Sequence, residues 1–513
     1  MTTMYAACEP ESDPGGMFSF EAVYDAYCAC RRRKRNTINA LRFEVDLLEN
    51  LFDLSEALCA GSYQPLRSVC FITQKPKLRE IFAADFRDRV VHHLLVPRLE
   101  RIFEPKFIHD SYACRKGKGT HAAVNRVKFF MNKITRGGRL PAWFMHLDIK
   151  SFFMSIDRTI LLKKIQKHVS DEQLMDLTRR IVDHDCTEQF VYKGNPGLQA
   201  KVPPHKSLFK IPPNKGLPIG NLTSQFFANV YLNELDQYVK HKLKAQYYVR
   251  YVDDCILLDD SRESLLELRG AMEGFLAREL LLSLKPEMTL KRVSEGADFL
   301  GYVVRPDYVL VRNRVVGNLK RKLCHFRKRM IVEGAIGRNS YTVHHLREHV
   351  VCDLRQTLAS CFGHFKHANT HRLIENIFET FDYLKKIFSV GNGYRLIPRY
   401  EPPFKPHRLA RQYGWFHNNY QDYCIFFQLG TFCEFFGSQA QRFFSLVRLK
   451  KCEDSRGLGP QCGFPMRMLK EFKQRALLAC RPYVVVAESG YYPSGLKRRV
   501  ITEIVTFEER KHG

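Results

Sequence analysis

Apolar residues recur at helical spacing near the start of the chain and at strand spacing around acidic positions further on. Residues 17–60 place apolar side chains three to four positions apart, which predicts amphipathic helices. Residues 141–160 predict a strand that continues into a turn and a helix. Residues 246–259, QYYVRYVDDCILLD, predict a β-hairpin with acidic residues at its tip between two apolar arms. The first half of the chain is therefore expected to combine helices with short strands.

Later segments predict a different mixture of elements. The Pro-, Gly- and Lys-rich stretch PPNKGLPIGN precedes an apolar helical pattern, SQFFANVYLNELDQYVKHKL. From about residue 317 to about residue 390 the pattern predicts basic helices, as in NLKRKLCHFRKRM. Residues 395–409 are rich in Pro and Arg and predict a linker. A compact mixed α/β segment is expected from there to the end.

Charge and composition narrow the class of protein. The 513 residues include 81 Lys and Arg against 54 Asp and Glu, a net charge of +27, which favours a polyanionic partner. A basic protein without such a partner is the alternative. The chain has no apolar run of the roughly 20 residues that span a bilayer and no signal-peptide pattern, so a cytoplasmic protein without a membrane partner is expected. The 16 scattered cysteines predict reduced thiols rather than a metal site.

Three carboxylates carry the predicted chemistry. Asp148 ends an apolar strand, and Asp253 and Asp254 occupy the hairpin tip. Adjacent carboxylates repel each other unless a cation neutralises them, and oxygen-rich clusters suit Mg²⁺. Two such ions activate an attacking hydroxyl and stabilise a leaving pyrophosphate. We therefore expect a catalytic site with two Mg²⁺ ions, or Mn²⁺, at Asp148, Asp253 and Asp254, with Ile149 at the metal site as well.

The order of these motifs resembles the reverse transcriptase palm. An Asp-bearing strand is followed by a Gly-rich turn with a helix and then by a Tyr-x-Asp-Asp hairpin, and FLGY at 299–302 matches the primer-grip region. The resemblance covers roughly residues 17–390. It implies an RNA-directed DNA polymerase with an α+β right-hand fold: fingers, an antiparallel-sheet palm and a helical thumb. Template RNA, cDNA, RNA/DNA hybrid and dNTPs are the implied partners.

The same resemblance implies a nucleotide site. SYACRKGKGTHAA resembles the fingers motif that holds the triphosphate, with Arg115 as the main candidate and Lys77 and Arg79 as helpers. Ordinary RNA-backbone contact is the alternative for all three. Phe153 lies at the family's steric-gate spacing after Asp148, where a bulky ring excludes a ribose 2′-hydroxyl; the alternative is a core aromatic.

A variant motif narrows the resemblance to diversity-generating retroelement reverse transcriptases. Most reverse transcriptases have Gln-Gly-x-x-x-Ser-Pro opposite the incoming base, whereas this chain has Ile219, Gly220 and, at the last position, Gln225. The resemblance implies an enzyme that copies a template-repeat RNA and misreads its adenines, in bacteria or phage, with an accessory variability protein as a further candidate partner. Ile219 cannot donate the hydrogen bond of Gln, and polar contacts provide large selectivity ratios.

One position departs from the family pattern. A lysine thought to protonate pyrophosphate is common before the Thr of LxLNPKKT, but this chain has LSLKPEMT with Glu287 and Met288 there. Lys285 and Lys291 are the candidate replacements.

The C-terminal segment resembles a second family, the N-terminal mismatch-recognition domain of MutS. FFQLGTFCEFFGSQAQRF contains the Phe-x-Glu pattern after Gly430, so Phe432 is expected to stack on a mispaired base and Glu434 to bond to it. A wedge of this kind unstacks a base step most cheaply where pairing is weak. The alternative is a core Phe432 and a surface Glu434. The implied fold is a small mixed α/β MutS-I-like domain.

These interpretations predict five segments and leave other functions open. The segments are an N-terminal helical extension (1–60), fingers and palm (61–310), a helical thumb (311–392), a linker (393–420) and the MutS-like domain (421–507). A defence-associated or retron-like reverse transcriptase is the nearest alternative, and a group II intron maturase is a further one. A catalytically idle RNA/DNA-binding scaffold is the alternative from another class.

Overall fold

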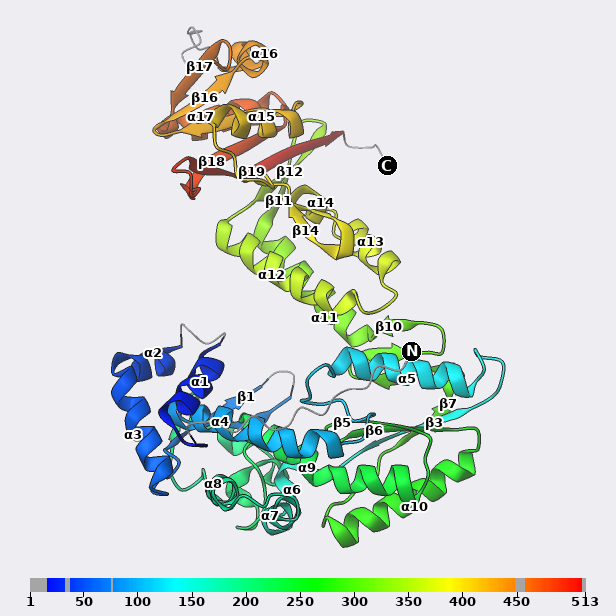
Figure 1. Ribbon diagram of the computed structural model, residues 1–513. Coiled ribbons are helices and arrows are strands. Elements are labelled where there is room, and N and C mark those ends of the chain that lie inside the picture. The colour runs from blue at the N-terminus through cyan, green and yellow to red at the C-terminus, as the bar shows by residue number, and fades with distance from the viewer. Residues whose placement is uncertain (1–15, 33–36, 75–76, 448–456, 510–513) are drawn as a thin grey trace, which may run out of the picture. The chain divides into compact units, whose positions relative to one another are not determined.

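Two compact units make up the chain. The computed structural model describes residues 16–32, 37–74, 77–447 and 457–509. Unit 1 comprises Met1–Leu300 and Val304–Asp307, and unit 2 comprises Gly301–Val303 and Tyr308–Gly513. Each unit combines helices with sheets, so the mixed α and β class is confirmed (Figure 1). Among the described residues, no helix is both long and apolar enough to cross a membrane.

Unit 1 begins with the predicted helical region. Its helices are α1 (Phe20–Arg31), α2 (Ile38–Val45) and α3 (Leu47–Cys59). The Ser19 hydroxyl caps α1 by accepting a hydrogen bond from the Ala22 amide at 3.2 Å. Buried apolar residues such as Val23 and Leu51 pack these helices into the core that they share with α4 (Phe86–Phe103). The prediction of helices over 17–60 is confirmed for the residues of this range that the structure describes.

A three-stranded sheet and further helices follow. Its order is β2-β1-β4, with β1 (Ser68–Thr73) antiparallel to β2 (Arg79–Ala83) and parallel to β4 (Phe190–Tyr192). The helices of this region are α5 (Thr120–Ile134), α6 (Phe152–Ser155), α7 (Arg158–Gln166), α8 (Glu172–Asp183), α9 (Leu222–Gln237) and α10 (Arg262–Glu279). Helix α9 is buried along most of its length, and its buried residues include the polar Asn229, Asn233 and Asp236 as well as apolar ones.

The second sheet of unit 1 carries the acidic residues. Its order is β5-β6-β3-β7, all antiparallel, with strands β3 (Trp143–Asp148), β5 (Tyr247–Tyr251), β6 (Asp254–Asp259) and β7 (Thr289–Arg292). Helix α5 covers one face of this sheet, and α9 and α10 lie along the other (Figure 1). The predicted strand–turn–helix at 141–160 and the predicted hairpin at 246–259 are both confirmed.

Short elements complete the chain. The segment in which it passes from unit 1 to unit 2 holds three short strands, β8 (Ala297–Phe299), β9 (Tyr302–Val304) and β10 (Val309–Val311). The short helices are η1 (Glu104–Lys106), η2 (Pro196–Lys201), η3 (Pro204–Lys206), η4 (Leu208–Lys210), the π-helix η5 (Tyr238–Lys242), η6 (Val293–Glu295), η7 (Asn392–Tyr394) and η8 (Met466–Met468).

Unit 2 contains basic helices, but a hairpin interrupts them. The helices are α11 (Asn313–Met330), α12 (Glu348–Phe365), α13 (His371–Thr380) and α14 (Tyr383–Ile387). Strands β11 (Ile331–Ile336) and β12 (Asn339–His345) lie between α11 and α12, so the prediction of continuous helices over this stretch was wrong. Its β-branched residues favour strands, and Gly337, with φ of +57°, supplies the turn.

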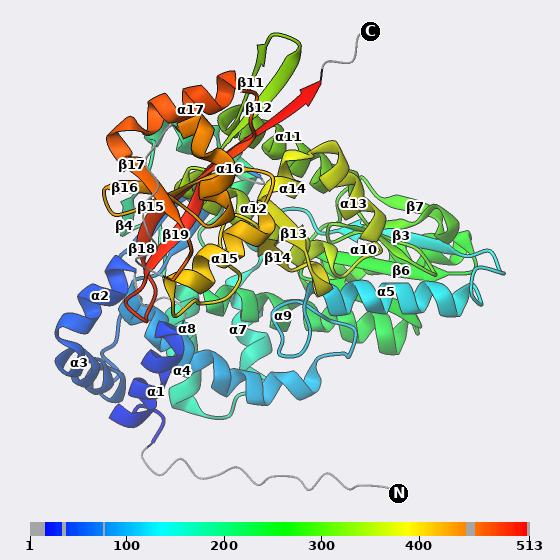
Figure 2. The ribbon, with the colours of Figure 1, turned by 90° about the horizontal axis from the view of Figure 1, so that it is seen from above.

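This hairpin extends the sheet of the C-terminal segment. The seven-stranded order is β11-β12-β19-β18-β15-β16-β17, and β12 pairs antiparallel with β19 from Asn339 opposite Glu509 to His345 opposite Glu503. The other strands are β15 (Cys424–Leu429), β16 (Phe432–Phe436), β17 (Gln461–Pro465), β18 (Tyr483–Tyr491) and β19 (Lys497–Glu509). Helices α16 (Ser438–Val447) and α17 (Leu469–Leu478) belong to the same segment. Figure 2 shows the hairpin beside β19. Tyr341 and Val343 of β12 pack against the segment's apolar core.

The expected linker is also structured. Residues 393–420 contain β14 (Leu396–Pro398), which pairs with β13 (Phe388–Val390), and helix α15 (Leu409–Asn419). Tyr413 of α15 is buried and donates a hydrogen bond to the Phe436 carbonyl at 3.2 Å. The described structure therefore shows folded elements where the Pro- and Arg-rich composition predicted a linker.

Candidate catalytic site and its relatives

The three predicted carboxylates lie together at one edge of the four-stranded sheet. Asp148, the last residue of β3, is the antiparallel partner of Asp254, the first residue of β6. Asp253 occupies the turn that joins β5 to β6, and its carbonyl accepts a hydrogen bond from the Ile149 amide at 3.4 Å. The structure therefore brings together acidic residues that are far apart in sequence.

Burial and repulsion between these carboxylates change the pKa of Asp253. Burial, together with the charges of Asp148 and Asp254, raises the pKa of Asp253 to about 6. Nζ of Lys285 donates a hydrogen bond to Oδ2 of Asp148, and its charge opposes the rise in the Asp253 pKa. Nε2 of His146 lies 3.4 Å from Oδ1 of Asp254. The site thus holds concentrated negative charge, with one ammonium group in contact with it.

The donor set fits a hard divalent cation in its chemistry. Oδ1 of Asp148 is buried and has no hydrogen-bond partner, which leaves an oxygen available to a cation. Across the described parts of the chain, no three or more Asp, Glu, His or Cys side chains come close enough to ligate one ion as they stand. Asp148, Asp253 and Asp254 would hold the ions after side-chain adjustment. The Ile149 side chain is buried, so this residue offers a metal its backbone alone.

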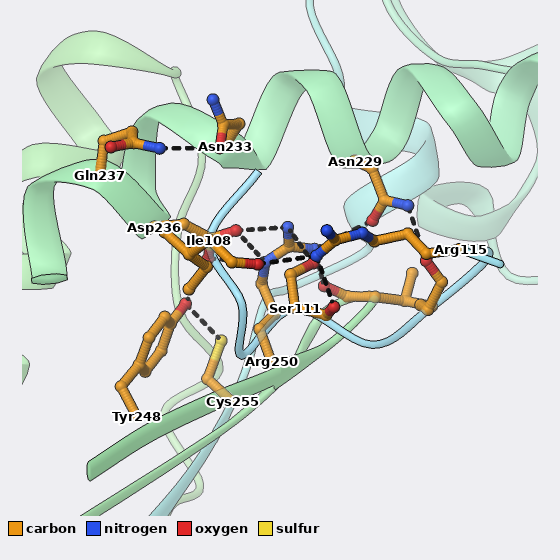
Figure 3. A network of polar contacts seen from close by, with 12 residues as sticks. Ile108, Ser111, Arg115, Asn229, Asn233, Asp236, Gln237, Tyr248, Arg250 and Cys255 are labelled. Carbon is orange, nitrogen blue, oxygen red and sulfur yellow. Dashed lines mark hydrogen bonds and ion pairs between the residues drawn. The ribbon is translucent and has the colours of Figure 1, made fainter. Parts of the chain in front are cut away.

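The three residues predicted to contact the triphosphate differ in their exposure to solvent. Lys77 and Arg79, at the β1–β2 hairpin, are exposed. Arg115, in contrast, is 6% exposed and forms an ion pair with Glu104 at 2.8 Å. Its Nη1 donates hydrogen bonds to the carbonyls of Ile108 at 2.7 Å and Ser111 at 2.8 Å (Figure 3). These contacts hold the loop that carries Arg115, and its contact with a triphosphate stays a prediction.

Phe153 and Ile219 share one apolar environment. Both pack against a cluster that we call the Phe82 cluster, whose buried members are Cys70, Phe82, Met154, Cys186 and Leu208. The backbone ties them together, because the Phe153 carbonyl accepts a hydrogen bond from the Leu217 amide at 2.8 Å. The Ile219 carbonyl accepts one from the Phe82 amide at 3.0 Å.

Gly220 and Gln225, the other two named positions of the motif that begins at Ile219, have separate roles. Gly220 has φ of +127°, and a Cβ there would lie 2.9 Å from Cγ2 of Ile81 and 3.2 Å from the Phe82 carbonyl oxygen. The close approach of this loop to β2 therefore requires glycine. Gln225 is exposed on α9, and its Oε1 accepts a hydrogen bond from the Cys114 thiol at 3.4 Å.

The residues predicted to bind a mismatched base lie beside a turn whose backbone is hydrogen-bonded to Glu488. Phe432 begins β16 and is 46% exposed, and Glu434 follows two positions later on the same face of the strand. The preceding Gly430 has φ of +58°, and its amide donates a hydrogen bond to Oε1 of Glu488 at 3.0 Å. Nη2 of Arg499 donates to the same oxygen at 2.7 Å. The exposed ring excludes the alternative of a core Phe432.

Several residues near the carboxylates were only partly foreseen. Of the two lysines proposed to replace the missing family lysine, Lys285 contacts Asp148, whereas Lys291 lies 3.8 Å from Glu295. His146 was missed, although its position two residues before Asp148 places it on the same face of the strand. Arg250 and Asp236 were also missed, and their charges within apolar stretches were the available signal.

Known proteins resemble two parts of this chain. Residues 72–304 match the family "Reverse transcriptase (RNA-dependent DNA polymerase)", and residues 407–507 match "MutS domain I". Protein YkfC of Escherichia coli is 24% identical over 302 residues, which cover 52% of this chain and 74% of YkfC. The group II intron-encoded protein LtrA of Lactococcus lactis is 25% identical over 324 residues. That alignment covers 50% of each chain, so this chain spans about half the length of LtrA.

A solved structure of Candida albicans telomerase is similar with a TM-score of 0.34 and 10% identity, covering 63% of this chain and 58% of that one. This likeness is too distant to support an argument about function. The family match covers the strand and the hairpin that bear all three carboxylates. Residues 72–304 therefore form a reverse transcriptase domain, an RNA-directed DNA polymerase.

Proposed function

We propose that this protein is the error-prone reverse transcriptase of a diversity-generating retroelement, which copies a template-repeat RNA into cDNA mutated at adenines. The observation that carries the polymerase assignment is the register of β3 against β6, which sets Asp148 opposite Asp254 with Asp253 in the adjoining turn. The net charge of +27 supports template RNA, cDNA and their hybrid as partners. An accessory variability protein is a further proposed partner.

The carboxylates provide the catalytic centre in this proposal. Asp148, Asp253 and Asp254 hold two Mg²⁺ ions, with Mn²⁺ as an alternative. When bound, such ions supply activation of the primer 3′-hydroxyl and stabilisation of the leaving pyrophosphate. The protein contributes a site in which burial, together with repulsion from Asp148 and Asp254, raises the pKa of Asp253 to about 6, and this repulsion favours cation binding.

The nucleotide pocket is proposed to lie at the Phe82 cluster. Phe153 and Ile219 pack against the same cluster, which supports their assignment to one pocket. A bulky ring at Phe153 would exclude a ribose 2′-hydroxyl and so select dNTPs. Ile219 offers the nascent pair no polar group, and a pocket without that contact discriminates less well. Arg115 is the proposed main contact with the triphosphate, with Lys77 and Arg79 as helpers.

The C-terminal domain is proposed to bind duplex DNA that contains mismatches. The exposed Phe432 ring lies beside a turn that is hydrogen-bonded to Glu488, and such a ring is suited to stack on a base in the minor groove. In this proposal Phe432 stacks on the mispaired base and Glu434 accepts a hydrogen bond from it. The domain would thereby hold the error-containing product of the polymerase.

Primer extension on an RNA template tests the polymerase assignment. The wild-type protein is expected to extend a DNA primer with dNTPs and Mg²⁺. The Asp253→Ala/Asp254→Ala variant is expected to show no extension while retaining template binding in gel shifts. Extension by this variant at the wild-type rate would remove the polymerase assignment, and a wild type that binds RNA without extending a primer would favour the idle scaffold.

Sequencing of the cDNA tests the adenine-mutagenic role. Ile219→Gln restores the polar group that most of the family has, so it is expected to lower misincorporation opposite template adenines. Ile219→Val is the matched control, because it keeps the site apolar and should keep the wild-type error spectrum. An identical spectrum in wild type and Ile219→Gln would contradict the role given to this side chain.

An intron-encoded reverse transcriptase is the second candidate. The similarity to the group II intron-encoded protein LtrA favours it. The same sequencing experiment separates the two candidates, because an enzyme of this kind has no reason to concentrate its errors at template adenines. A wild-type error spectrum without adenine bias would therefore favour the intron-encoded class.

A further inference from the structure

One strand of the catalytic hairpin carries a fully buried guanidinium group. Arg250, on β5, has 0% exposure and forms an ion pair with Asp236 of α9, which is also 0% exposed. Nη2 of Arg250 lies 2.5 Å from Oδ2 of Asp236, and Nε donates to Oδ1 at 2.8 Å (Figure 3). The Tyr248 hydroxyl donates a further hydrogen bond to Oδ1 of Asp236 at 2.8 Å. The carboxylate of Asp236 is therefore held from two sides.

The remaining donors of Arg250 reach the hairpin turn, a second residue of α9 and the loop around residue 111. Nη1 donates to the Val252 carbonyl at 3.0 Å and to Oδ1 of Asn229 at 3.3 Å. Nη2 donates to the Ser111 hydroxyl at 3.1 Å. Asn229 in turn donates to the Ala113 carbonyl at 2.7 Å. One side chain thus joins the hairpin turn, helix α9 and the loop around residue 111.

The turn that Arg250 contacts is strained by its own sequence. Val252 has φ of +56°, a left-handed conformation that is unfavourable for a β-branched residue. The turn contains Val252 and Asp253 alone, because Tyr251 and Asp254 already pair across the hairpin. A contact to the Val252 carbonyl therefore bears directly on the position of the Asp253 carboxylate.

Stability alone is a poor explanation for this pair. Two charges lose their hydration on burial, and well-packed apolar residues often replace such pairs without loss of stability. What an apolar pair cannot supply is a set of directed donors at fixed angles. Lysine cannot supply them either, because the planar guanidinium presents five donors in one fork and an ammonium does not.

We propose that Arg250, held by Asp236, is a positioning residue that fixes the Val252–Asp253 turn and so sets the catalytic carboxylates for metal binding. Arg250 acts through Asp253 and Asp254 and does not itself contact the nucleotide. The inference rests on the proposed polymerase function of the same hairpin. Arg250 thereby supports the catalytic site from within the protein, through its hydrogen bond to the Val252 carbonyl.

The test is single-nucleotide incorporation by the full chain on an RNA template with a DNA primer. Arg250→Lys is expected to lower kcat by about 100-fold, since a misplacement of about 1 Å costs that much. The KM for dNTP should stay near the wild-type value, and the half-saturating Mg²⁺ concentration should rise several-fold. The matched control is Arg180→Lys. Arg180 also pairs with a carboxylate, Asp176 at 2.7 Å, and with a carbonyl, that of Tyr63 at 3.3 Å, but it lies on α8.

A second variant separates positioning from stability. Arg250→Met/Asp236→Asn removes both charges and keeps an acceptor for the Tyr248 hydroxyl, so its melting temperature should return close to that of wild type. Its kcat should remain low and its Mg²⁺ requirement high, and that combination supports the proposal. A double variant with wild-type kcat and Mg²⁺ requirement, or an Arg250→Lys protein indistinguishable from Arg180→Lys, overturns it. A wild type that fails to incorporate any nucleotide would instead overturn the proposed function on which the inference rests.

Discussion

Asp253 is expected to carry a destabilising negative charge in the metal-free protein near neutral pH. Burial and two neighbouring carboxylates raise the pKa of Asp253 from its ordinary value of 3.8 to about 6. Asp253→Asn removes this charge with little change in shape. We therefore expect the variant to be more stable than wild type near neutral pH without metal, and to be inactive in primer extension.

The magnitude follows from linkage between protonation and folding. The folded state holds the proton more tightly than the unfolded chain, so the stability contributed by this group falls as pH rises from about 4 to about 6. A shift of about two pKa units is worth about 3 kcal/mol for a fully buried group. Because Asp253 is half-buried and screened by solvent, we expect about 2 kcal/mol. For a unit of roughly 300 residues this corresponds to an increase of about 3 °C in melting temperature.

The assay is thermal unfolding of wild type and Asp253→Asn with a chelator present, at about pH 7.5 and about pH 4.5. The variant should be more stable at the higher pH, and its advantage should shrink at the lower pH because wild-type Asp253 is then protonated. Added Mg²⁺ should stabilise wild type more than the variant. A variant that is no more stable than wild type at the higher pH, or an advantage independent of pH, would refute this electrostatic account.

Three further outcomes are expected from other parts of the structure. Gly220→Ala should cost about 1–3 kcal/mol of stability, because φ is unfavourable and the new Cβ meets Ile81; unchanged denaturant unfolding would contradict this. Deletion of residues 407–513 should cause aggregation, measured by light scattering, because it leaves β12 and Tyr341 uncovered; a monodisperse truncated protein would show that the hairpin does not need the C-terminal sheet. Phe432→Ala should weaken preference for mismatched over matched duplex about tenfold in gel shifts, with Phe432→Leu intermediate; an undiminished preference would exclude stacking by that ring.

The sequence predicted the local elements of the site well because their signals are local. Two apolar arms around the acidic residues 253 and 254 were sufficient to locate the hairpin, and a run of apolar residues located the strand that ends at Asp148. The pairing of Asp148 with Asp254 depends on register between strands far apart in the chain. No local pattern determines that register, and the family resemblance supplied the expectation instead.

Long-range contacts explain what the sequence did not reveal. The β11–β12 hairpin was missed because basic helices flank it and its pairing partner, β19, lies more than a hundred residues later. The contacts of Arg115 with Glu104 and two carbonyls were not foreseen, and its predicted triphosphate contact stays a prediction. Charged residues are mostly exposed in proteins, so the sequence did not indicate that Arg250 is buried or that Asp236 of α9 is its partner.

The number of Mn²⁺ ions bound to the assembled complex shows whether the three carboxylates form a two-metal site. The complex would contain the full chain, an RNA template, a DNA primer that lacks its 3′-hydroxyl and the matching dNTP, and electron paramagnetic resonance would count the bound ions. We predict about two Mn²⁺ ions per wild-type complex and at least one fewer in Asp254→Asn, because the two-ion site depends on these carboxylates. Equal occupancy in the two complexes, or no tightly bound Mn²⁺ in wild type, would contradict the account.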